Sequence, residues 1–78
     1  QSIKIYPNPS HDKITLKHNL SIPHAVLEIY NELGQLIEKQ SVLNSSIDID
    51  LTHQKNGMYL LKFLDQDKLI YQTKLLKE

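Results

Sequence analysis

The sequence predicts an all-β domain, a single antiparallel β-sandwich of about seven strands with immunoglobulin-like proportions. Apolar and polar residues alternate with period two in seven short segments. Turn-forming residues separate these segments every eight to twelve residues, and helical periodicity is hard to find. Regularly spaced short strands of this kind are typical of a sandwich or barrel.

The first two predicted strands, residues 2–6 and 12–17, are joined by a proline-rich elbow in the stretch "IYPNPSHDKITLK". Pro7 and Pro9 each fix their own φ and restrict the residue before them, so we expect Tyr6 and Asn8 to be extended. Such an elbow would present the first strand in one fixed direction. A plainer interpretation is that the prolines blunt a sheet edge and shorten a loop.

The middle strands are predicted at residues 24–31, 35–41 and 45–51, with Gly34 supplying the positive φ of a hairpin turn between the first two. Because side chains alternate between the two faces of a strand, each strand buries every second residue. The apolar sets expected to face inward from residues 12–51 are Ile14, Leu16, Ala25, Leu27, Ile29, Ile47, Ile49 and Leu51.

The last two strands are predicted at residues 58–64 and 69–76, with Asn56 and Gly57 marking the turn before them and "DQDK" the hairpin between them. Of the aromatic side chains, only Tyr6 and Tyr30 are expected to be exposed. The alternation predicts two further core rows, which are Tyr59, Leu61 and Phe63 in one strand and Leu69, Tyr71, Thr73 and Leu75 in the other.

Composition excludes several classes of protein. The 78 residues suffice for one domain, which buries roughly 60–65% of the surface of its unfolded chain. There is no cysteine for a disulfide or a thiolate zinc site. Nine lysines without arginine balance nine acids, so a nucleic-acid partner is not expected. No apolar run is long enough to enter a membrane. A chain that begins at Gln1 is expected to belong to a longer or processed protein.

Catalytic and metal-binding arrangements are weakly supported. "SHD" at residues 10–12 contains the residue types of a hydrolase triad, but successive side chains of an extended segment point to opposite faces and do not converge. The four histidines lack the spacing of zinc ligands. The acidic pairs at residues 48 and 50 and residues 65 and 67 lack the converging oxygens of a calcium loop. We therefore predict no catalytic, cofactor-binding or metal-binding residue, and no enzyme.

Four separated motifs carry a family resemblance. They are the opening "IYPNPSHDKITL", the segment "LEIYNELGQLIEK" around Gly34, the segment "IDIDLTHQKNGMYLLKF" with its Gly-x-Tyr element, and the terminal "KLLKE". In this order and spacing the sequence resembles the carboxy-terminal sorting domain of the type IX secretion system, also called the Por secretion system, in its type A subfamily. The resemblance covers residues 3–78.

The resemblance implies an address label at the carboxyl end of a larger secreted protein, with the whole of residues 1–78 as the label. The implied partners are an upstream cargo domain in the same chain, the type IX translocon with its shuttle proteins, and a sortase-like surface peptidase. The protein would pass through the periplasm and reach the cell surface or the medium. The residues that the resemblance assigns to translocon recognition are Tyr6, Pro7, Asn8, Pro9, Gly34, Gly57, Tyr59, Lys74, Leu75, Leu76 and Lys77.

A physical mechanism for recognition is strand addition. If the last strand lies at a sheet edge, its unpaired backbone groups can pair with a receptor strand, while the elbow holds the tether away from that edge. Deleting residues 74–78 is then expected to leave the core folded and to block secretion. The alternatives are an accessory β-sandwich that binds carbohydrate or a cell surface, and a structural spacer or adhesin repeat.

Overall fold

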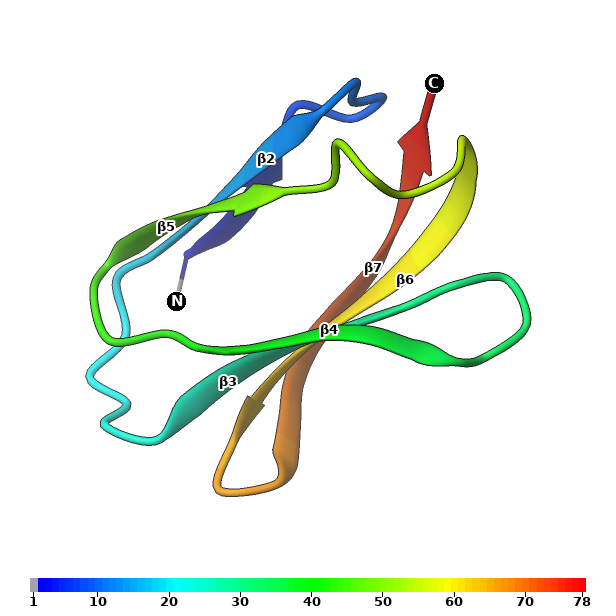
Figure 1. Ribbon diagram of the computed structural model, residues 1–78. Coiled ribbons are helices and arrows are strands. Elements are labelled where there is room, and N and C mark those ends of the chain that lie inside the picture. Colours follow the sequence, from blue (N-terminus) through cyan, green and yellow to red (C-terminus); the bar gives the residue numbers. More distant parts are fainter. Residues whose placement is uncertain (1) are drawn as a thin grey trace.

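The computed structural model describes residues 2–78, and it is built from strands alone (Figure 1). No helix within residues 2–78 is long and apolar enough to cross a membrane. The seven strands are β1 (Ile3–Tyr6), β2 (Lys13–His18), β3 (Ala25–Tyr30), β4 (Leu36–Ser41), β5 (Ser46–Asp50), β6 (Gly57–Asp65) and β7 (Lys68–Lys77).

Two antiparallel sheets form the domain, which confirms the predicted sandwich. One sheet has the order β1-β2-β5, and the other has the order β4-β3-β6-β7. The chain changes sheets between β2 and β3, between β4 and β5, and between β5 and β6. β1, β5, β4 and β7 are therefore the four edge strands.

The core lies between the sheets and consists of the residues that alternate inward from each strand. Phe63 and Leu61 of β6 are fully buried and belong to one core cluster with Ile14 and Leu16 of β2 in the other sheet. Burial of these apolar side chains is the main favourable contribution to folding. The buried cluster contains Ile14, Leu16, Ala25, Leu27, Ile29, Val42, Ile49, Leu51, Tyr59, Leu61, Phe63 and Leu75, with Ile47 packed against it.

The predicted inward row of the last strand is wrong at its first two members. A β-bulge makes Phe63 pair with Tyr71 and Leu64 pair with Leu69, so Ile70 is an extra residue between them. The bulge interrupts the alternation, and Leu69 and Tyr71 no longer share a face. Both are at the surface, with 47% and 36% of their area exposed, because β7 is an edge strand with a neighbour on one side only.

The elbow after β1, the carboxyl end of β7 and the start of β6 lie at one end of the sandwich (Figure 1), and a hydrogen bond from the Met58 amide to Glu32 ties the turn between β3 and β4 to them. We call this the motif end, because residues 7–10, 31–35, 55–59 and 74–78 belong to it. The opposite end carries the loops between β2 and β3 and between β4 and β5.

Candidate functional site

The elbow lies against the outer edge of β7. The peptide bonds before Pro7 and Pro9 are both cis, and Asn8 between them turns its side chain toward β7. Its Nδ2 donates to the Lys74 carbonyl and its Oδ1 accepts from the Leu76 amide, each at 3.1 Å. An asparagine side chain carries both a donor and an acceptor, so Asn8 makes the two bonds that a neighbouring strand would make.

The backbone of Ser10 extends this contact to the last residue. Its amide donates to the Leu76 carbonyl at 2.8 Å, and its carbonyl accepts from the Glu78 amide at 2.9 Å. Ser10 and Lys77 thereby form a parallel bridge, and a ring nitrogen of His11 lies 2.9 Å from the Glu78 carbonyl. The elbow thus serves as a short added strand on the carboxyl half of β7.

This contact corrects two expectations. The elbow itself does not stand apart from the edge of the last strand, because it is hydrogen-bonded to that edge. The backbone groups of Leu76 are not available to a receptor strand, because Asn8 and Ser10 already hold them. An edge group that has a partner inside the domain offers no free site for strand addition.

The two glycine motifs also meet at the motif end. Asn31 shapes the turn before Gly34 by accepting from the amides of Leu33 and Gln35 at 2.9 Å, and Gly34 has φ +80°. From the same turn, Glu32 Oε1 accepts from the Met58 amide at 2.9 Å. These bonds tie the turn between β3 and β4 to the start of β6.

Gly57 is required by its backbone conformation, and the approach of Glu32 adds to this requirement. Its φ is +147°, and a Cβ built at this position would lie 2.6 Å from Glu32 Oε1, which is closer than real Cβ contacts. Only glycine takes up this conformation without strain and leaves room for the carboxylate. The glycine of the Gly-x-Tyr element is therefore explained locally by its positive φ together with the approach of Glu32.

Several of the predicted recognition residues are buried and cannot touch a partner directly. Tyr59 is 6% exposed and donates from its hydroxyl to the Lys55 carbonyl. Burial raises the pKa of Tyr59, and the Glu32 charge raises it further. Leu75 is 1% exposed, and Lys77 is 5% exposed with its Nζ 3.2 Å from Asn56 Oδ1. These residues hold the motif end together from inside.

The remaining predicted recognition residues lie at or near the surface of the domain. Tyr6 is 40% exposed, as expected for this aromatic. Tyr30, also expected to be exposed, is half-buried. Gly57 and Leu76 are half-buried. The exposed members of the predicted set are Tyr6, Pro7, Asn8, Pro9, Gly34 and Lys74.

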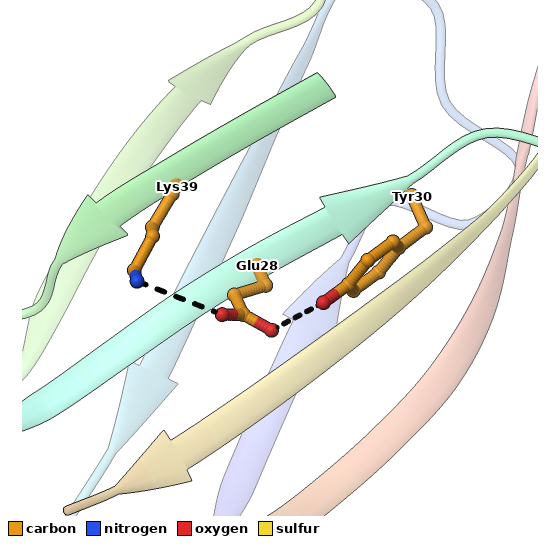
Figure 2. A network of polar contacts seen from close by, with 3 residues as sticks. All are labelled: Glu28, Tyr30 and Lys39. Carbon is orange, nitrogen blue, oxygen red and sulfur yellow. Dashed lines mark hydrogen bonds and ion pairs between the residues drawn. The ribbon is translucent and has the colours of Figure 1, made fainter. Parts of the chain in front are cut away.

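Polar contacts fix Tyr30 on the outer face of the four-stranded sheet (Figure 2). Its hydroxyl donates to Glu28 Oε1 at 2.6 Å, and this bond raises the pKa of Tyr30. Lys39 Nζ lies 3.9 Å from Glu28 Oε2, as Figure 2 shows, and Lys62 Nζ lies 5.0 Å from the centre of the Tyr30 ring. Tyr30 lines a shallow hollow together with Gly34 and Lys74, so the network borders the motif end.

The deletion of residues 74–78 is no longer expected to spare the fold. It would remove Leu75 from the core, and losing a buried leucine side chain costs about 2–5 kcal/mol. It would also remove every β7 partner of the elbow. Point substitutions at exposed positions are the better test of recognition.

The residues of the "SHD" segment have structural contacts. Ser10 and His11 bond to β7 as described, and the Asp12 carbonyl accepts from the Leu51 amide. Within residues 2–78 no three histidine, aspartate or glutamate side chains come close enough together to hold a metal ion.

Sequence reasoning missed Asn31, Glu32 and the pairing role of Asn8. An asparagine followed three positions later by glycine is a recognisable turn signal for Asn31. The partners of Asn8 and Glu32 lie 66 and 26 positions away along the chain, so no local pattern indicates them.

The domain has two sheets, and its amino-terminal elbow is hydrogen-bonded to its last strand. Comparison with known families agrees with the resemblance that the sequence motifs carry. Residues 4–78 match the family described as "Secretion system C-terminal sorting domain", and the chain belongs to this family. It is therefore a sorting domain of the type IX secretion system, the class of protein that the sequence motifs indicate.

A curated relative is the "Ulvan lyase NLR42" of Nonlabens ulvanivorans, which is 37% identical over 76 residues. The match takes in 96% of this chain and 14% of the relative. The chain thus spans about a seventh of the length of that protein.

Proposed function

We propose that residues 1–78 act as a folded carboxy-terminal label that carries an upstream cargo domain through the type IX outer-membrane translocon. The cargo carries a signal for export across the inner membrane, and the label folds in the periplasm before recognition. The translocon and its shuttle proteins recognise the label there. A sortase-like peptidase then acts at the cell surface, where the cargo is attached or released. The label itself performs no catalysis.

The observation that carries this proposal is the joining of the elbow to the last strand by Asn8 and Ser10. Two motifs at opposite ends of the sequence form one continuous surface with Lys74 exposed beside them. A receptor that contacts this surface reads both motifs together, and it reads them only in the folded domain.

The experiment is a transplant with a matched pair of variants. Residues 1–78 are fused to the carboxyl end of a fluorescent protein with an export signal and are followed in a bacterium with a working type IX system. Fluorescence at the surface or in the medium, lost when the translocon is disabled, is the expected result. Cargo that is exported and folded but stays periplasmic would contradict the proposal.

The variants locate the recognised surface. Lys74→Glu reverses an exposed charge at the motif end and is expected to reduce secretion. Leu43→Glu places a charge on a side chain that is 80% exposed in the loop between β4 and β5, at the opposite end, and is expected to leave secretion unchanged. Equal secretion of the two variants would show that the motif end is not the recognised surface.

A further inference from the structure

The outer edge of β7 is divided into an occupied half and an open half. Asn8 and Ser10 occupy the half from the Lys74 carbonyl to the Glu78 amide. Alternate residues of a strand point their backbone N–H and C=O groups to the same side. The backbone groups of Gln72 therefore point to the outer edge, as those of Lys74 and Leu76 do. The Lys74 amide and both backbone groups of Gln72 have no backbone partner on this side within residues 2–78.

The open half differs from the other three edges in its charge. Edge strands commonly carry charged residues that discourage pairing with another chain. β5 carries Asp48 and Asp50, β4 carries Glu38 and Lys39, and β1 has four residues that include Lys4. In β7 the five residues 69–73 are all uncharged, and Leu69 and Tyr71 expose large apolar surfaces beside the open backbone groups.

A lysine stands at each end of this uncharged stretch. Lys68 and Lys74 are both exposed, and neither forms an ion pair within the part of the chain that the structure describes. If a second copy of this chain paired antiparallel on the same edge with the two uncharged stretches centred on each other, Lys68 would lie opposite Lys74, and like charges directly opposite each other are destabilising. The edge therefore fits a different partner, with acidic residues where this edge has lysines.

We propose that residues 69–74 of β7 form a strand-pairing site for an extended segment of another protein, one with an uncharged apolar centre and an acidic residue at each end. Backbone bonds to Gln72 and Lys74 hold the segment, and Leu69 and Tyr71 contact its side chains. The elbow continues the same added-strand position along the rest of β7, so a longer segment competes with Asn8. The site lies beside the motif end, and it goes beyond the proposed function because it does not depend on secretion.

The test uses the 78-residue chain and two synthetic peptides. Each peptide has seven residues, with valine and threonine alternating in its centre. One peptide has a glutamate at each end, and the other has a lysine at each end. Binding is followed by the NMR shifts and exchange rates of backbone amides. The glutamate peptide is expected to shift and protect the Gln72 and Lys74 amides, with the lysine peptide at least fivefold weaker.

Three variants sharpen the result. Gln72→Pro removes an outward amide that β6 does not use and is expected to abolish binding. Lys68→Glu keeps the edge open, so it is informative even if the proline variant fails to fold. It leaves one acidic and one basic residue beside the open edge, so it should abolish the preference between the two peptides. Asn8→Ala frees the occupied half of the edge. It is expected to strengthen, by about fivefold, the binding of a peptide lengthened to eleven residues. Asn19→Ala is the control and should leave this binding unchanged.

Other outcomes overturn the proposal. Equal binding of the two peptides would refute the role of the lysines. Shifts confined to β1, β4 or β5 would refute the location, as would the absence of any shift at millimolar peptide. Concentration-dependent pairing of the chain with itself through Gln72 would identify a second copy as the partner and refute a foreign segment.

Discussion

Replacing Asn8 with alanine removes both side-chain bonds between the elbow and β7. A hydrogen bond contributes about 0.5–1.5 kcal/mol net, and Asn8 is exposed, so water can reach the Lys74 carbonyl and the Leu76 amide once the side chain is gone. The low end of the range therefore applies to each bond. We expect Asn8→Ala to lower the free energy of unfolding by about 1 kcal/mol, which lowers Tm by roughly 4–8 °C in a domain of this size.

The assay combines thermal unfolding, followed by circular dichroism, with amide exchange. In Asn8→Ala the Leu76 amide should exchange about fivefold faster, because 1 kcal/mol changes an opening equilibrium by that factor. Asn8→Asp keeps the acceptor for Leu76 but loses the donor to Lys74, so its effect on Leu76 exchange should be smaller.

Asn19→Ala is the control, because the Asn19 side chain bonds the Ser2 amide at 3.0 Å and does not touch β7. An unchanged Tm together with unchanged Leu76 exchange in Asn8→Ala would refute the added-strand role of the elbow.

Three further predictions concern the interior of the motif end and the core. Gly57→Ala should lower the free energy of unfolding by about 1–3 kcal/mol in denaturant unfolding, and it should cost more than Gly34→Ala. The reason is that a Cβ at residue 57 meets Glu32, whereas a Cβ at residue 34 has no neighbouring atom within 4 Å. Equal losses in the two variants would contradict the contact with Glu32. The pKa of Tyr59 is raised above its usual 10.0, so above that pH the native state keeps the phenol proton while the unfolded chain loses it. The free energy of unfolding should therefore fall as pH rises above about 10. The free energy of unfolding of Tyr59→Phe should fall less steeply over the same range. Phe63→Ala should cost about 3–5 kcal/mol because Phe63 is completely buried, and a loss below 1 kcal/mol would show that the two sheets do not pack as described.

The strands and their inward faces could be predicted from alternation alone. Ile14 and Leu16, for example, are fully buried, as their spacing indicates. The prediction fails at Leu69 and Tyr71 because a bulge depends on how two strands pair, which the sequence of one strand does not reveal. Within the candidate site, Gly57 could be recognised as a turn glycine, but its close approach to Glu32 depends on how two turns pack together.

The role of Asn8 shows the same limit more sharply. A proline-flanked asparagine predicts a stiff connection, and this is what a local pattern can establish. That the side chain pairs with a strand 66 positions later follows from the way the sandwich closes, which brings the end of β1 beside the end of β7. Sequence reasoning therefore identified both segments without identifying their contact.

The path of β1 separates the start of the domain from the motif end. Ile3 pairs with His18 at the opposite end of the sandwich, and the chain reaches the elbow only after Tyr6. No bond that forms the motif end uses a residue before Asn8 among the contacts described. The described chain thus starts at the end opposite the motif end, so a cargo domain fused before residue 1 is expected to leave that surface free.

This arrangement predicts that cutting the cargo away leaves the label unchanged. A protease site placed directly before residue 1 of the fusion, when cut, should leave the Tm of the label and the exchange rate of the Leu76 amide within error of their values in the intact fusion. The strand β1 still holds the entry, since its Ile3 and Ile5 pack against the core. If cleavage instead loosened Leu76, the cargo would be supporting the elbow, and the motif end could not be a surface that the 78 residues build alone.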